Sequence, residues 1–189
     1  MKPGWTKSWL CVSAIVAMAT TATAALPQNA KRVKRANELT LFGIRPGKDG
    51  LSSVKKRVGV KWLHQESPRV WDGHDDCSGL QLRVEIDDKD LVETVEIGPW
   101  FKEGDCSGQP SMKIWATGRG LRLKDKRERV IEIYGEPNST SPTVKNDKEL
   151  ELLYYAFDWA GSDVPQVMEI SCDKATGLVV EIMLAFPSL

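Results

Sequence analysis

The stretch VIEIYGEP at residues 130–137 decides the fold, because the chain carries a second copy of its pattern, VKKRVG, at residues 54–59. In both copies a valine is followed five residues later by a glycine, either Gly59 or Gly135. Glycine in the left-handed conformation ends a helix, and Pro137 prevents the helix from continuing. Each copy therefore predicts a short helix that ends at its glycine.

Matching segments surround the two copies. A glycine–hydrophobic–arginine start and a Lys–Asp pair precede each of them, with starts at Gly43 and Gly120 and pairs ending at Asp49 and Asp125. The spacing places Asp49 or Ser52 at the N-cap of the first helix, and Asp125 with Glu128 has the spacing of a capping box. The chain is therefore interpreted as a tandem of two similar units.

Alternating apolar residues predict the strands that accompany these helices. The predicted strands cover residues 39–42, 80–86, 91–97, 112–116, 150–159, 166–172 and 178–184. Asp88-Lys89 and Asp173-Lys174 mark turns between strands in the two copies. Residues 136–148 are predicted to form a polar loop. The fold class predicted is α+β, with each unit a short helix packed on an antiparallel sheet, over residues 39–104 and 105–189.

The N-terminus has the pattern of a secretory signal peptide. Lys2 and Lys7 precede a short apolar run, and Ala22 and Ala24 fit a cleavage site, so residues 1–24 are predicted to be removed. The alternative, an uncleaved membrane anchor, conflicts with an apolar run too short to span a bilayer. Residues 25–38 are predicted to be a flexible basic leader, and the mature chain is expected to be exported to the periplasm or the extracellular space.

The charge balance argues against a nucleic-acid partner. The full chain has 26 basic and 26 acidic side chains, and removal of two lysines with the signal peptide leaves 24 against 26. A protein that binds nucleic acid normally carries a clear excess of basic residues. No membrane span is expected after the signal peptide is removed.

Three cysteines remain in the mature chain: Cys77, Cys106 and Cys172. Cys77 and Cys106 occur in matching turn-like contexts, Asp-Cys-Ser-Gly in both cases, and are predicted to form a disulfide. Cys172 follows an apolar strand pattern and is interpreted as a buried, inert thiol. The sequence does not prove this pairing, and three free thiols remain the alternative.

The motif Gly-Leu-Arg-Leu-Lys-Asp from residue 120, followed by Val130, Tyr134, Gly135 and Pro137, resembles the repeat of the β-lactamase-inhibitory-protein-like fold. The same unit occurs singly in the SmpA/OmlA-type lipoprotein of outer-membrane β-barrel assembly. The resemblance covers most of residues 39–186 as two copies. It implies a concave sheet surface that grips another protein, although no inhibitory loop can be matched residue by residue. Fold resemblance alone says little about function.

Two polar segments have the residue types of known chemical sites, and neither satisfies the full pattern. Residues 72–77 gather Asp72, His74, Asp75, Asp76 and Cys77, but the spacing matches neither a calcium loop nor a zinc site, and a solvated acidic hairpin tip is the preferred interpretation. Residues 104–110 superficially echo the nucleophile loop of trypsin-like proteases, with Cys106 inserted. No catalytic residue, no metal ligand and no cofactor is therefore predicted.

Aromatic residues in the connecting segments are the best candidates for binding. Trp100 and Phe101 stand in an otherwise polar connector. For these two residues, and also for Trp71 and Trp115, two interpretations stay open. Buried aromatic anchors dominate protein interfaces, but the same residues could seal a joint between the two units. All four are interpreted as candidate protein-binding residues.

The sequence thus favours a secreted, non-enzymatic protein-binding module, possibly inhibitor-like, whose target is unknown. The first alternative is a cell-envelope scaffold or assembly factor. The second is a small hydrolase that uses an Asp/Glu pair, although no pattern in the sequence places acids such as Asp72 and Asp75 around a cleft.

Overall fold

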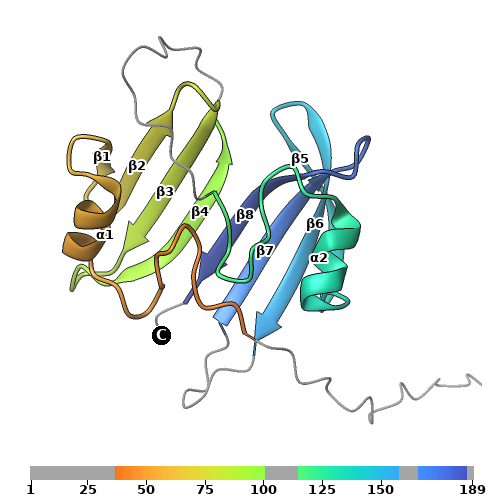
Figure 1. Ribbon diagram of the computed structural model, residues 1–189, viewed down its shortest axis with the longest axis horizontal. Helices are drawn as coiled ribbons and strands as arrows, with labels where there is room; N and C mark the ends of the chain where they lie inside the picture. Colours follow the sequence, from red (N-terminus) through yellow and green to blue (C-terminus); the bar gives the residue numbers. More distant parts are fainter. Residues whose placement is uncertain (1–36, 101–114, 158–165, 187–189) are drawn as a thin grey trace, which may run out of the picture. The chain divides into compact units, whose positions relative to one another are not determined.

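The computed structural model describes residues 37–100, 115–157 and 166–186 (Figure 1). The predicted signal peptide and nearly all of the predicted leader lie outside these residues, as do Phe101 and Cys106. The described elements, in chain order, are α1 (Leu51–Val58), β1 (Leu63–Ser67), β2 (Val70–Asp75), β3 (Leu80–Ile86), β4 (Val92–Pro99), α2 (Arg127–Tyr134), β5 (Ser139–Lys145), β6 (Lys148–Phe157), β7 (Gln166–Asp173) and β8 (Val179–Ala185).

The strands form one eight-stranded antiparallel sheet in the order β1-β2-β3-β4-β8-β7-β6-β5. The prediction of two α+β units, each a helix on its own sheet, is therefore wrong. β4 pairs with β8 from Thr94↔Ala185 to Ile97↔Ile182, which makes the two sets of strands continuous. An unpaired strand edge exposes a row of backbone N–H and C=O groups, and this pairing satisfies one edge from each set. The fold is dominated by the sheet, with two short helices.

The repeated sequence motif builds a turn before each helix. The turns contain Gly43 and Gly120 at φ 69° and 87°, a backbone conformation that glycine adopts at little cost. The two aspartates predicted as N-caps have another role. Asp49 Oδ2 accepts a hydrogen bond from the backbone N–H of Arg45, and Asp125 Oδ2 accepts one from that of Arg122, both at 2.8 Å.

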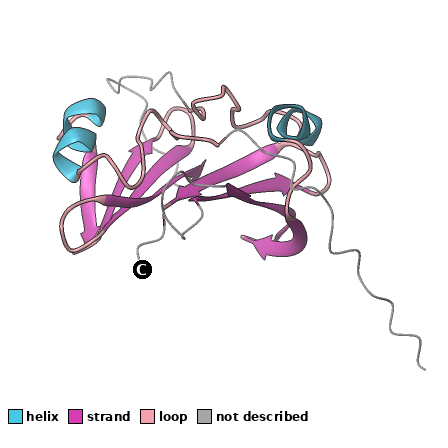
Figure 2. Ribbon diagram, turned by 90° about the horizontal axis from the view of Figure 1, so that it is seen from below, coloured by secondary structure: helices cyan, strands magenta, loops and turns pink. Residues whose placement is uncertain are grey.

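Both helices lie on the same side of the sheet (Figure 2). α1 buries Leu51, Val54 and Val58, and α2 buries Val130 and Tyr134. Each helix has only eight residues, too short to be stable alone, so packing on the sheet must hold it in place. Side chains from both ends of the sheet, such as Leu82 and Ile170, belong to one continuous apolar core.

The first described segment ties the start of the chain to its second half. The Phe42 N–H donates to the Ala116 carbonyl, and the Gly118 N–H donates to the Thr40 carbonyl. Glu38 is 1% exposed. Its carboxylate accepts hydrogen bonds from the backbone N–H groups of residues 39, 40, 118 and 119 and, at 2.6 Å, from the Tyr134 hydroxyl. This carboxylate therefore links three separate segments.

The described cysteines are Cys77, which is exposed, and Cys172, which is buried. Burial raises the pKa of the Cys172 thiol to about 11, in agreement with the predicted inert thiol. No disulfide bond is present among the described residues, and the predicted Cys77–Cys106 bond stays a prediction because Cys106 lies outside them. No helix in the described part of the chain has the length and apolar character needed to cross a membrane.

Candidate protein-binding face

Neither described helix covers the opposite side of the sheet, and we call this side the open face. Core residues such as Leu82 and Ile170 alternate along their strands with half-buried neighbours such as Arg83 and Glu169, which project from the open face. Because pairing is continuous from β1 to β5, one row of open-face residues crosses all eight strands. The row consists of His64, Asp72, Arg83, Glu96, Met183, Glu169, Tyr154 and Ser139.

Ionisable side chains dominate the open face on β1 to β4, and half-buried apolar side chains are mixed with charged ones on β6 to β8. The row carries ionisable side chains at every position from β1 to β4. On β6, β7 and β8 the half-buried apolar side chains of the open face are Leu152, Tyr154, Val167 and Met183. Tyrosine and methionine are enriched at protein interfaces, and apolar side chains gathered on an uncovered sheet face mark a surface for association.

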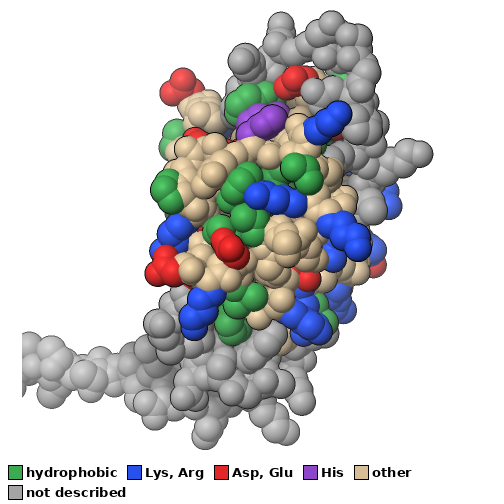
Figure 3. Space-filling model, turned by 90° about the vertical axis from the view of Figure 1, so that its left-hand side faces the viewer, with side chains coloured by type: hydrophobic (Ala, Val, Ile, Leu, Met, Phe, Trp, Pro, Cys, Tyr) green, Lys and Arg blue, Asp and Glu red, His purple; other side chains and the backbone are tan. Residues whose placement is uncertain are grey.

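A pocket of about 260 Å³ lies at the β1–β2 end of this face and is lined by His64, Gln65, Glu66, Asp72, His74 and Trp100. The indole ring of Trp100 stacks on the His74 ring with centroids 3.6 Å apart. The Trp100 Nε1–H donates to Asp76 Oδ1 at 3.1 Å, which fixes the orientation of the indole. Figure 3 faces the side of the molecule that carries α1 and β1, and it shows histidine next to apolar side chains.

One arginine, Arg83, lies close to three carboxylates beside this pocket. Arg83 Nη1 lies 3.2 Å from Glu66 and 3.8 Å from Asp72, and Arg83 Nε lies 3.7 Å from Glu85. Burial of Asp72, together with its hydrogen bond to Glu66, raises the pKa of Asp72 to about 7. The same hydrogen bond, with Arg83 nearby, lowers the pKa of Glu66. Asp72 is therefore partly protonated near neutral pH, whereas Glu66 is ionised.

A second charged cluster lies where β4 meets β8, and it has its own cation. Lys145, at the end of β5, forms an ion pair with Glu96 at 3.5 Å and another with Glu181. Burial and the neighbouring Glu181 raise the pKa of Glu96. Since β6, β7 and β8 separate β5 from β4 in the sheet, the β5–β6 hairpin must curl over the open face for Lys145 to reach Glu96.

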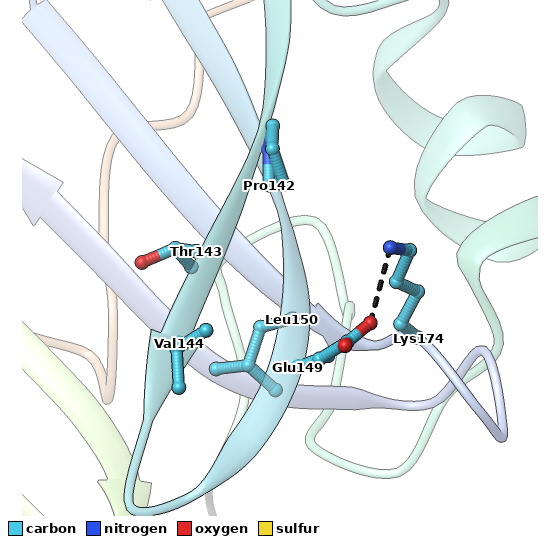
Figure 4. Close-up of a pocket in the computed structure, with 6 residues that line it drawn as sticks. All are labelled: Pro142, Thr143, Val144, Glu149, Leu150 and Lys174. Carbon is cyan, nitrogen blue, oxygen red and sulfur yellow. Dashed lines mark hydrogen bonds and ion pairs between the residues drawn. The ribbon is translucent and has the colours of Figure 1, made fainter.

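The curl of this hairpin also shapes a pocket of about 400 Å³ (Figure 4). Leu150 belongs to the open face by register but is only 4% exposed, whereas Val144 near the hairpin tip is 70% exposed. The one ion pair drawn here joins Lys174 to Glu149 at 3.2 Å, and both side chains are more than half exposed. This pocket therefore offers no buried charge with which to hold a ligand.

The structure separates the aromatic residues that the sequence grouped together. Trp100 borders the open-face pocket. Trp71 and Trp115 instead pack against the apolar core, where the Lys55 ammonium lies 3.6 Å above the Trp71 ring and the Trp115 ring lies 5.0 Å from that of Phe42. Of the described candidates, only Trp100 therefore lies beside the open face.

Sequence reasoning missed the charged residues of the open face. Residues 72–77 were predicted to form an acidic hairpin tip, but residues 72–75 belong to strand β2 and only residues 76 and 77 lie in the turn that follows it. Asp72 and His74 alternate with Trp71 and Gly73, which is a two-residue period, and this alternation was the available signal. In the described part of the chain no group of three or more His, Cys, Asp or Glu side chains is arranged to hold a metal ion.

Comparison with known proteins gives no relative for this chain: no family model, no curated protein and no solved structure was found to match it. The geometry of the open face is therefore the basis for a functional proposal.

Proposed function

We propose that this chain is a secreted, non-enzymatic protein-binding module, and that its partner docks on the open face of the sheet. The observation that carries the proposal is the set of half-buried apolar side chains on the open face, Leu152, Tyr154, Val167 and Met183, which lie on the same continuous face as the ionisable residues of β1 to β4. Antiparallel sheets often leave one face to solvent, but such a face is normally polar throughout. These apolar side chains are the feature that solvent exposure alone does not explain.

Three further features support a protein partner. The face is rigid, because its residues stand on paired strands and not on loops, so little conformational entropy is lost on binding. Met183 and Tyr154 occupy the row, and the Trp100 indole lies at its edge. The Gly120–Pro137 motif resembles the repeat of the β-lactamase-inhibitory-protein-like fold. This resemblance implies a sheet surface that binds another protein.

A small hydrolase remains the second candidate, and one observation favours it. Glu66 and Asp72 line the same pocket and their pKa values are shifted in opposite directions, which is an arrangement that general acid–base catalysis also uses. A hydrolase should lose turnover when Asp72 is replaced by asparagine, whereas a binding module should lose only affinity. An envelope scaffold, the other alternative from the sequence, would differ from both because it would sediment with membranes or wall material.

The proposal is tested by affinity capture with the mature chain (residues 25–189) from the native secretome and from detergent-solubilised envelope. The variants are Met183→Lys and Tyr154→Lys on the open face, with Val60→Lys as the matched control because Val60 is 69% exposed near α1. We expect one stoichiometric protein that is lost with both face variants and retained with the control. Retention by all variants would contradict docking on this face.

A further inference from the structure

We propose that the partner inserts an arginine side chain into the open-face pocket lined by Asp72, Glu66 and Trp100. This inference rests on the proposed function and specifies the chemistry of the partner: a protein surface with a protruding guanidinium. Charge, pocket size and pocket walls each support it.

The charge argument comes from a comparison of the two clusters on the open face. At the β4–β8 joint, two carboxylates, Glu96 and Glu181, share Lys145. Beside the pocket, Arg83 is shared by Glu66, Asp72 and Glu85, of which Glu66 and Asp72 line the pocket. Each cluster thus has one cation from the chain, but the cluster beside the pocket holds three carboxylates for one guanidinium when Asp72 loses its proton. A cation from a partner would restore the balance.

The size of the pocket favours a side chain over a free ligand. Its volume of about 260 Å³ is below the roughly 300–1,000 Å³ that is usual for pockets holding whole small molecules. A single guanidinium is planar and fits between carboxylates and an aromatic wall. Such a group reaches the pocket from a protein surface that covers the rest of the face.

The walls favour arginine over lysine. A guanidinium donates two parallel hydrogen bonds to a carboxylate and also stacks on aromatic rings, whereas an ammonium is a compact point charge. The pocket lining includes both features, the carboxyl groups of Glu66 and Asp72 and the Trp100–His74 stack. The Asp72 side chain is 13% exposed, and its buried Oδ1 has no hydrogen-bond partner among the described residues. A guanidinium bound here would strengthen the polar contacts of this carboxylate.

The first test uses a small probe, N-acetyl-arginine amide, with N-acetyl-citrulline amide as its uncharged isostere. NMR titration of the isotope-labelled mature chain should show shifts centred on the Trp100 indole N–H and on the His74 ring with the arginine probe only. Asp72→Asn should weaken this binding at least about fivefold, because a charge-assisted hydrogen bond is lost. Glu128→Gln, an exposed carboxylate on α2, is the matched control and should leave binding unchanged.

Equal shifts with citrulline, or equal affinity in the Asp72→Asn variant, would overturn the arginine site. Glu66→Gln gives a second, independent variant, because Glu66 is exposed and its replacement leaves the core untouched.

The second test separates this inference from the proposed function. With the captured partner, Asp72→Asn should weaken binding at least about tenfold, and Met183→Lys should weaken it as well. If Met183→Lys abolishes binding and Asp72→Asn leaves it unchanged, the arginine site is wrong and the binding face stands. If neither variant changes the affinity, both the arginine site and the binding face are wrong.

Discussion

Replacing Asp72 with asparagine is expected to stabilise the folded chain above pH 7. The pKa of Asp72 rises from 3.8 to about 7 on folding, chiefly because burial disfavours the ionised carboxylate. Each pK unit corresponds to about 1.4 kcal/mol, so the charge costs the fold at most about 4 kcal/mol. The pocket is open to water, which screens the charge, and we expect a gain of about 1–2 kcal/mol in the free energy of unfolding.

The sign of the pH dependence makes this prediction specific. Because the folded-state pKa is raised, the folded chain binds the Asp72 proton more tightly than the unfolded chain between about pH 4 and 7. The free energy of unfolding contributed by Asp72 therefore falls as pH rises through this range. The asparagine variant lacks that loss and still donates a hydrogen bond to Glu66, as the protonated acid does.

Urea denaturation of both proteins, followed by tryptophan fluorescence, measures the difference at pH 8.5 and at pH 3.5. The variant should be the more stable at pH 8.5, and the two proteins should be equal at pH 3.5. A variant that is less stable at pH 8.5, or a difference that does not change with pH, would contradict the reasoning. A residue that destabilises its own fold and strengthens binding is typical of a functional site.

Four other predictions concern the network at Glu38, the hairpin, the packing of β2 and the pH dependence of binding. Glu38→Gln should lower the free energy of unfolding by about 2–3 kcal/mol in urea titrations, because donors that include the Tyr134 hydroxyl lose a buried acceptor; an unchanged midpoint would show that the network is not needed. Lys145→Ala should speed amide hydrogen exchange in the β5–β6 hairpin, since its ion pairs with β4 and β8 hold the hairpin over the open face; unchanged exchange would show that the hairpin curls without them. Gly73→Ala should cost about 3 kcal/mol of thermal or urea stability, because the new Cβ would lie 2.1 Å from the Trp62 ring, and a neutral effect would contradict this packing. Partner affinity, measured by calorimetry, should fall as pH drops below about 7, where Asp72 takes up its proton; affinity that rises on acidification would contradict a cationic anchor.

The titratable groups that face Asp72 should also lower the partner affinity when the pH falls. Acidification neutralises carboxylates and adds positive charge to imidazoles, and both changes repel an incoming cation. The titratable and charged side chains around Asp72 are His64 and Glu66 on β1, His74 on β2, Arg83 and Glu85 on β3, and Glu96 on β4.

The sequence predicted the elements whose residues have a regular apolar period. The strand predicted at 80–86 coincides with β3, and the helix before Gly135 coincides with α2, which buries Val130 and Tyr134 as expected. These segments are readable because one of their sides packs against the core and the other does not. Local periodicity reports this difference directly.

The strands that were missed are polar for identifiable reasons. β2 contains Asp72 and His74, which project from the open face, and Gly73, which has no side chain because the Trp62 ring lies over it. β5 was predicted to be a loop because it is an exposed edge strand with Pro142, a residue that edges tolerate. β2 lacks an alternating apolar pattern because of its polar open-face residues and Gly73, and β5 lacks one because it is exposed at the sheet edge.

The joining of the strands into one sheet was not predictable from local patterns. β4 ends at Pro99 and β8 begins only at Val179, and their pairing depends on which strand edges meet. Alternation shows which side of a strand is buried but not which neighbour it pairs with. The shared guanidinium of Arg83 follows from the same pairing, because Asp72↔Arg83 and Arg83↔Glu96 are register neighbours on different strands.

Hydroxyl-radical footprinting of the mature chain, alone and with its captured partner, tests the binding face most directly. The open face carries Met183, Tyr154, His74 and Trp100, whose side chains oxidise readily and report their own accessibility. The account predicts that the partner protects these four residues and leaves the oxidation of Val60, which is exposed near α1, unchanged. Protection of Val60 with no protection of Met183 and Tyr154 would contradict it.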